Sequence, residues 1–187
     1  MTPDPITPDP LDALRQPTTP VTPPAPFAAA LRARLAISLE TTTMAITPYL
    51  IVDGAAAAID FYRAAFGAVE TFRLDMPDGR VGHAELSFGG AEIALADEYP
   101  EWGLLGPIAR GGTTVTLQLD VPDVDEVVAT AAAAGATIER PPADQFHGSR
   151  VGTVIDPFGH RWSVRTHIED VPVDEMRRRL AELEGDG

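Results

Sequence analysis

The feature that most constrains this chain is a strand–helix–strand–strand–strand order that occurs twice along it. The first copy spans about residues 46–98 and the second about 113–168. Neither copy is large enough to bury both faces of its own sheet. The sequence therefore predicts an α+β fold over residues 45–187, in which two βαβββ modules pack together, within one chain or between subunits, and enclose a cleft.

The first copy shows clear signals for each of its elements. β-branched and aromatic residues favour a strand at 46–52. A helix is expected at 55–66, because apolar residues recur on one side and Gly67 can end it. The strands that follow are expected at 69–74, 81–88 and 91–96.

The second copy repeats this order. A strand is expected at 113–119, and Asp123 opens a helix with Glu126 placed three residues later, which is the spacing of a capping box. Gly135 is placed to end that helix. The remaining strands are expected at 137–140, 152–155 and 161–166.

The two ends of the chain differ from the repeat. Half of the 18 prolines lie within the first 26 residues, so residues 1–44 are expected to form an extended Pro-rich arm. A short amphipathic helix is expected inside this arm at 27–40, and Met44 is an alternative start of the protein. A helical tail is expected at about 172–184.

Charge and composition exclude several classes of function. The chain has no cysteine, and all 14 of its basic residues are arginine, which removes thiol catalysis, disulfides and lysine Schiff-base chemistry. The net charge of −14 opposes binding to a phosphate backbone, so no nucleic-acid partner is expected. No apolar run reaches the roughly 20 residues of a membrane span, and no secretory signal is present. We expect a cytoplasmic protein without a membrane partner.

Four motifs together resemble a known family over roughly residues 45–175. They are Ile46-Thr47-Pro48-Tyr49-Leu50, Asp60-Phe61-Tyr62 with Phe66-Gly67, Gly82-His83-Ala84-Glu85-Leu86, and Asp156-Pro157-Phe158-Gly159-His160-Arg161-Trp162. The pattern resembles the vicinal oxygen chelate (glyoxalase/bleomycin resistance/dioxygenase) superfamily, and within it the PhnB-like branch. The resemblance implies paired βαβββ modules around a cleft and a homodimer, formed side by side or with exchanged modules.

The resemblance also implies where a divalent metal ion would bind. In metal-dependent members, His and Glu side chains on the first and last strand of each module hold the ion. The matching positions in this chain are Thr47, Ala94, Thr116 and Ser163, and both 116 − 47 and 163 − 94 equal 69, as a duplication requires. Alanine has no donor atom and neutral hydroxyls bind divalent ions weakly. We therefore expect no metal cofactor at these positions.

A relocated metal site is the alternative. His83 and Glu85 are two residues apart, so both point to one face of a strand and could hold one divalent ion, with His160 or Glu92 as further ligands. The other interpretation is that His83 and Glu85 lie on a solvent face or form hydrogen bonds within the sheet.

Strand alternation predicts which residues line the cleft. The residues in phase with the four metal positions are mostly polar, which favours a ligand pocket over a packed barrel interior. Arg161 and Arg165 could bind a carboxylate or pair with Glu92 and neighbouring acids, and Trp102 and Phe146 would rim the cleft from loops. The predicted ligand-binding residues are Thr47, Tyr49, Glu92, Thr116, Gln118, Arg161, Ser163 and Arg165.

The resemblance then implies two classes of function. The first is a metal-free small-molecule-binding protein that sequesters a drug or metabolite, with a cationic ligand favoured by the acidic chain. The alternative is a lyase, isomerase or dioxygenase that uses a relocated metal near His83 and Glu85. A cofactor-free enzyme with Glu92 or Glu85 as general base is a third hypothesis.

Overall fold

The computed structural model describes residues 45–185. The chain divides into two units, Met1–Ala45 and Ile46–Gly187, and every element below belongs to the second. The predicted Pro-rich arm, with its helix at 27–40, lies outside the described residues.

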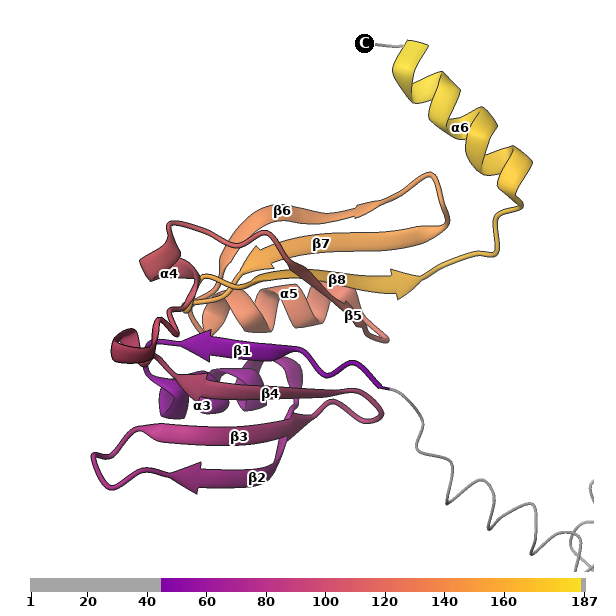
Figure 1. The fold of residues 1–187 in the computed structure, drawn as a ribbon. Coiled ribbons are helices and arrows are strands. Elements are labelled where there is room, and N and C mark those ends of the chain that lie inside the picture. The colour runs from indigo at the N-terminus through magenta and orange to yellow at the C-terminus, as the bar shows by residue number, and fades with distance from the viewer. Residues whose placement is uncertain (1–44, 186–187) are drawn as a thin grey trace, which may run out of the picture. The chain divides into compact units, whose positions relative to one another are not determined.

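The first module contains one helix and one four-stranded sheet (Figure 1). Its sheet has the order β1-β4-β3-β2, with β1 parallel to β4 and the other neighbours antiparallel. The elements are β1 (Tyr49–Val52), α3 (Ala55–Phe66), β2 (Val69–Asp75), β3 (Val81–Ser87) and β4 (Glu92–Asp97).

The second module has the same topology, with the order β5-β8-β7-β6. Its elements are β5 (Thr116–Asp120), α5 (Val124–Ala133), β6 (Thr137–Asp144), β7 (Ser149–Ile155) and β8 (Arg161–His167). The short helices η1 (Pro100–Trp102) and α4 (Pro107–Arg110) connect the modules, and α6 (Val173–Gly185) follows β8. The predicted pair of βαβββ modules is confirmed.

The strand register repeats between the modules. Tyr49 of β1 lies opposite Ala94 of β4, and Gln118 of β5 lies opposite Ser163 of β8. Both 118 − 49 and 163 − 94 equal 69, so the spacing found in the sequence is also the spacing of paired positions in the two sheets.

Some predicted boundaries differ from the observed ones. β1 begins at Tyr49 instead of residue 46, and β5 begins at Thr116 instead of residue 113. β6 continues through two prolines to Asp144, whereas the strand was expected at 137–140. Prolines are tolerated there because β6 is an edge strand that pairs with β7 alone, and its register shifts near them.

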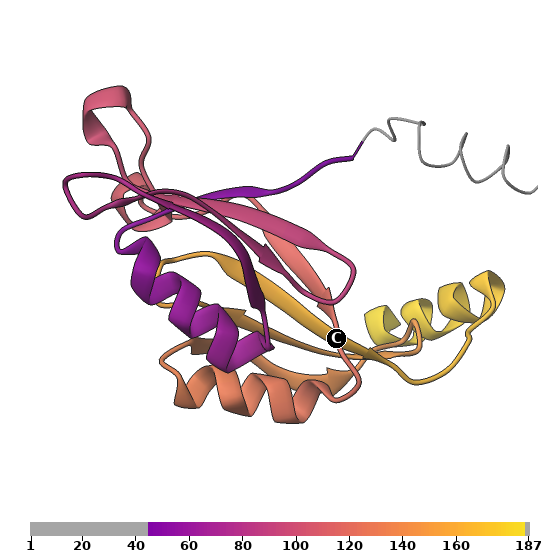
Figure 2. The same cartoon turned by 90° about the horizontal axis from the view of Figure 1, so that it is seen from below.

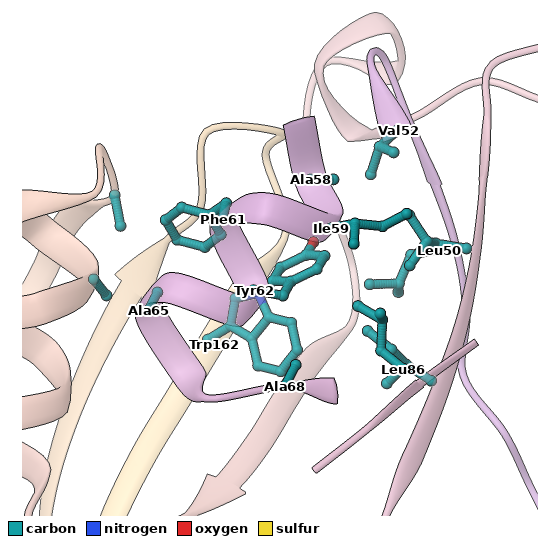
Figure 3. Close-up of a cluster of buried hydrophobic side chains, with 14 of the residues drawn as sticks. Leu50, Val52, Ala58, Ile59, Phe61, Tyr62, Ala65, Ala68, Leu86 and Trp162 are labelled. Atoms are coloured by element: carbon teal, nitrogen blue, oxygen red, sulfur yellow. The ribbon is translucent and has the colours of Figure 1, made fainter. Parts of the chain in front are cut away.

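One hydrophobic core serves both modules. Figure 2 shows α3 and α5 on the same side of the two sheets, and residues from both helices and both sheets form a single buried cluster. Figure 3 shows its centre, where Tyr62 of α3 lies beside Trp162 of β8 with ring centroids 5.4 Å apart. Burial of this apolar surface is the main force that holds the modules together.

A buried carboxylate joins the modules inside this core. Asp156 is 3% exposed, and one of its oxygens accepts hydrogen bonds from the Tyr62 hydroxyl (2.7 Å) and the Trp162 indole N–H (2.9 Å). Its other oxygen accepts from the backbone N–H groups of Phe158 and His160, which fixes the turn between β7 and β8. Burial and the nearby Asp156 carboxylate raise the pKa of Tyr62 well above its usual value.

Each module also fastens the start of its helix from the sheet. A carboxylate oxygen of Asp97 accepts from the backbone N–H groups of Gly54 and Ala55 at 3.0 and 2.7 Å. Thr166 lies 69 residues later, since 166 − 97 = 69, and its hydroxyl accepts from the backbone N–H of Val124 at 2.9 Å. The first turns of α3 and α5 are therefore held by side chains at equivalent strand positions, a carboxylate in the first module and a hydroxyl in the second.

Candidate functional site

The two sheets each have a face that points away from α3 and α5, which we call the helix-free face. Leu50 and Val52 of β1 are buried in the core, so their neighbours Tyr49 and Ile51 belong to the opposite face. In the first module the central residues of this face are Tyr49, Ile51, His83, Glu85, Ala94 and Ala96.

A pocket of about 490 Å³ lies on the helix-free face of the first module. Strands β1, β3 and β4 supply one part of its wall, and the turn between β2 and β3 and the loop after β4 supply the rest. The lining residues are Tyr49, Ile51, Met76, Gly82, Ala96, Tyr99, Trp102 and Leu104. Most of these side chains are apolar or aromatic, which is typical of a pocket for a small organic ligand.

Gly82 leaves room for the Met76 side chain in this pocket. A Cβ atom at residue 82 would lie 2.8 Å from the sulfur of Met76, closer than van der Waals contact allows. Glycine therefore lets the Met76 side chain lie directly against β3 and contribute its flexible thioether to the lining.

The loop side of the pocket is built around Tyr99. The guanidinium carbon of Arg80 lies 3.9 Å from the centre of the Tyr99 ring, and the Trp102 ring stacks on Tyr99 at 4.8 Å. Arg80 is in turn paired with Asp78 and Glu101, which raise its pKa. Cation–π contact and stacking fix the loop next to the strands.

Within residues 45–185, the Tyr99 hydroxyl has no hydrogen-bond partner. The residue is 4% exposed, and among the described residues its oxygen is the buried side-chain polar atom without a hydrogen bond. A buried hydroxyl left without a hydrogen bond costs free energy. This unpaired hydroxyl belongs to a residue that lines the pocket.

A chain of three polar side chains crosses the same face. The Tyr49 hydroxyl lies 2.9 Å from Nδ1 of His83, and Nε2 of His83 lies 3.3 Å from Oε1 of Glu85. Ala94 pairs with both Tyr49 and Glu85, so no large side chain from β4 separates them. His83 and Glu85 therefore share one face of β3, as predicted, and His83 hydrogen-bonds to Glu85 along the strand and to Tyr49 across the sheet.

The environment keeps Tyr49 protonated at neutral pH. Burial, followed by the nearby Tyr99, raises the pKa of the Tyr49 phenol above its usual value. Tyr49 therefore takes part in the pocket as a neutral hydroxyl group.

The residues present do not fit a divalent ion at the positions that the resemblance implies. Thr47, Ala94, Thr116 and Ser163 supply no carboxylate, imidazole or thiolate. Within residues 45–185, no three or more His, Cys, Asp or Glu side chains are grouped so that they could hold an ion. In particular, His160 is directed to the carbonyl oxygen of Ile51 at 3.3 Å.

The helix-free face of the second module is polar and internally paired. Arg161 donates to Glu139 at 2.8 Å, and Arg165 pairs with Asp120. The Gln118 amide lies beside the Arg165 guanidinium. Of the two roles predicted for these arginines, the structure contains the pairing with neighbouring acids.

The eight residues predicted to bind a ligand are distributed over several places. Tyr49 lines the 490 Å³ pocket, whereas Arg161 lines a cavity of about 360 Å³ and Arg165 one of about 480 Å³. Gln118 and Ser163 are paired on the helix-free face of the second module. The exposed residues at strand ends or beside them are Thr47, Glu92 and Thr116. Ligand contact by this set stays a prediction.

The loop residues of the pocket were partly foreseen. Trp102 was expected to rim the cleft, and it lines the pocket. Phe146, expected to do the same, lines a different cavity of about 500 Å³ together with Arg179 and Leu183 of α6. Met76 and Tyr99 were not predicted to line the pocket. The two aromatic residues Tyr99 and Trp102, three positions apart, were a sequence signal for stacking within this loop.

None of the helices in the described part of the chain has both the length and the apolar character needed to cross a membrane.

Comparisons with known proteins agree with this architecture. The family model of the Glyoxalase/Bleomycin resistance protein/Dioxygenase superfamily matches residues 41–164. An uncharacterised protein of Mycobacterium bovis is 42% identical over 156 residues, which are 82% of this chain and 100% of that protein. The crystal structure of TioX from Micromonospora sp. ML1 is similar with a TM-score of 0.52 at 29% identity, covering 67% of this chain and 100% of that one.

A PhnB protein from Bacillus cereus has the same fold. Its TM-score is 0.53 at 19% identity, and the match covers 66% of this chain and 99% of that one. The family match spans both modules, from β1 into β8. With its duplicated βαβββ fold, the chain therefore belongs to the Glyoxalase/Bleomycin resistance protein/Dioxygenase superfamily.

Proposed function

We propose that this protein binds a small, planar and mostly apolar molecule in the pocket of the first module, without a metal ion. The observation that carries this proposal is the pocket itself, about 490 Å³ in volume and lined mainly by apolar and aromatic side chains. The absence of metal-ligating side chains at the four family positions supports binding rather than metal-assisted catalysis.

Two exposed aromatic side chains support a planar ligand. Trp102 is 68% exposed and Tyr49 is 51% exposed, although both line the pocket. A flat ligand between them would bury ring surface and stack, which contributes about 0.5–1.5 kcal/mol per aromatic pair. The net charge of −14 further favours a ligand with a protonated amine during encounter.

We also propose that the protein acts as a homodimer. Phe72 and Leu74 of β2 are 48% and 53% exposed, beside the helix-free face of the first module. A second copy of the chain would cover these side chains and enclose the pocket further. Sedimentation of the wild type and of the Phe72→Ser, Leu74→Ser double variant tests this: loss of the dimer in the variant supports it, and a monomeric wild type contradicts it.

Tryptophan fluorescence tests the binding function. Trp102 is exposed at the pocket and Trp162 is buried in the core, so a ligand in the pocket should quench mainly Trp102. Proflavine and 9-aminoacridine are suitable planar cationic probes. Quenching that saturates in the wild type and disappears in Trp102→Phe is the expected result.

A matched pair of variants locates the binding. Ala96→Leu places extra volume in the pocket wall, whereas Ala133→Leu makes the same change at an exposed position of α5. Probe affinity should fall at least tenfold in the first variant and stay unchanged in the second. Equal affinity in both variants would contradict the proposed site, and so would binding that requires about one metal ion per chain in protein purified without chelator.

A further inference from the structure

We propose that Tyr49 makes this pocket selective for ligands that carry an N–H or O–H donor. Tyr49, His83 and Glu85 form a hydrogen-bonded chain of side chains, in which the Tyr49 phenol donates its proton to His83. This inference rests on the proposed function of the pocket. It concerns the direction of two hydrogen bonds, and that direction follows from the donors and acceptors each group possesses.

Glu85 sets the direction of the chain. An ionised carboxylate can only accept hydrogen bonds, so the nitrogen that faces Glu85, Nε2 of His83 at 3.3 Å, carries the proton. A neutral imidazole has one N–H and one acceptor nitrogen. Nδ1 of His83 is therefore the acceptor.

The Tyr49 hydroxyl completes the chain. It lies 2.9 Å from Nδ1 of His83, within the range of a normal hydrogen bond, and so it donates its proton to that nitrogen. The His83 ring is held on two sides, with its centroid 5.4 Å from that of Tyr49 and 5.9 Å from that of Phe72. This packing limits rotation of the imidazole.

The small residue at position 94 allows this arrangement. Ala94 of β4 lies between Tyr49 of β1 and Glu85 of β3 in the strand register. A long side chain at residue 94 would occupy the space through which Tyr49 and His83 meet. The position at which the resemblance implies a metal ligand thus holds a small side chain here, beside the hydrogen-bonded Tyr49, His83 and Glu85.

Once its proton is committed, the Tyr49 oxygen offers only lone pairs to the pocket. The pocket lining also contains two other side-chain donors, the Tyr99 hydroxyl and the Trp102 indole, and among the described residues neither of them hydrogen-bonds to the Tyr49 oxygen. A ligand N–H or O–H group is the natural complement. The predicted ligands are therefore planar ring systems with an amine, amide, phenol or heterocyclic N–H group at the edge that meets Tyr49.

Indole and benzofuran form a matched pair of probes for this selectivity. They have the same bicyclic shape, and the N–H group of indole is replaced by an oxygen in benzofuran. Each is titrated into the full chain at neutral pH and followed by amide chemical shifts in NMR spectra. Indole should bind about 3- to 10-fold more tightly, which corresponds to one neutral hydrogen bond.

Two variants test whether Tyr49 and its chain cause this preference. Tyr49→Phe removes the acceptor oxygen and should bring the affinity ratio of the two probes to about one. Glu85→Gln allows the opposite histidine tautomer, because an amide can donate to Nε2, and should also reduce the ratio. Asp60→Asn removes a carboxylate from the exposed side of α3 and should leave the ratio unchanged.

The outcomes separate this inference from the proposed function. Binding of both probes with equal affinity to the wild type overturns the donor selectivity but leaves the pocket function intact. A preference for indole that persists in Tyr49→Phe, or that is lost equally in Asp60→Asn, also overturns the selectivity. If neither probe shifts the amides of residues lining the pocket at the limit of its solubility, the proposed binding function fails, and the selectivity fails with it.

Discussion

The hydroxyl of Tyr62 in α3 donates a 2.7 Å hydrogen bond to Asp156, in the turn between β7 and β8, and so connects the two modules inside their shared core. Removing this hydroxyl in Tyr62→Phe leaves the Trp162 indole as the remaining side-chain donor to the same oxygen. The free energy of unfolding should fall by about 1–3 kcal/mol, because a buried charged acceptor loses a donor. Urea denaturation measures this change, and an unaltered midpoint would show that the bond does not stabilise the module interface.

Tyr99→Phe should behave in the opposite way. The Tyr99 hydroxyl is buried and has no partner among the described residues, so its removal takes away an unsatisfied group and no hydrogen bond. We expect the ligand-free protein to be equally stable or more stable, by up to about 1 kcal/mol. The same urea denaturation serves here, with Tyr62→Phe as the matched comparison. A loss of stability as large as that of Tyr62→Phe would mean that Tyr99 has a partner.

The Asp97 carboxylate should contribute more to stability than its counterpart Thr166. Asp97 accepts from two backbone N–H groups at the start of α3 and from a third, that of Val81, at 2.6 Å. Asp97→Ala leaves all three donors unpaired and should cost roughly 3 kcal/mol or more. Thr166→Val removes one cap of α5 and should cost about 1 kcal/mol. Calorimetric unfolding of both variants compares them, and the reverse order of stabilities would refute this account.

Stability should decrease in mild acid because of His160. Burial lowers the pKa of His160 below its usual value of 6.5, although the Asp156 carboxylate acts in the opposite direction. The unfolded chain then binds more protons than the folded protein between the lowered pKa and about 6.5, so stability rises with pH across that window and falls as pH drops through it. His160→Gln should flatten this dependence between pH 5.5 and 7.5 in urea denaturation. An equally steep slope in the variant would assign the effect to another group.

Regular elements could be predicted from the sequence because their signals are local. The helix expected at 55–66 is α3, since Gly67 adopts the left-handed conformation (φ 68°) that ends it. Asp123 caps α5 by accepting from the backbone N–H of Glu126, as the capping-box spacing predicted. The length of β6 was missed because its prolines are harmless only on an edge strand, and a strand's place in the sheet is a property of the tertiary fold.

The pocket was harder to predict than the fold. Strand alternation placed Tyr49 on the cleft and put His83 and Glu85 on a common face of their strand, but it does not apply to Met76 and Tyr99, which lie outside the strands. The resemblance directed attention to equivalent positions in both modules, whereas the pocket uses one module and a loop that has no counterpart in the repeat. In the second module, Arg161 pairs with Glu139 and Arg165 pairs with Asp120. These partners could not be predicted because they depend on how far each side chain reaches across the strands.

The fastening of each helix by Asp97 and Thr166 has an evolutionary consequence. Both anchors act from strand ends toward the helical layer, so they do not depend on the exposed side chains of Tyr49 and its equivalent Gln118. Mutations at these two sites should therefore carry little penalty in folding, whereas the buried Ala94 requires a small side chain. One module can then acquire an aromatic pocket while the other acquires ion pairs on the same face. The two modules can thus diverge in surface chemistry while both keep their fold.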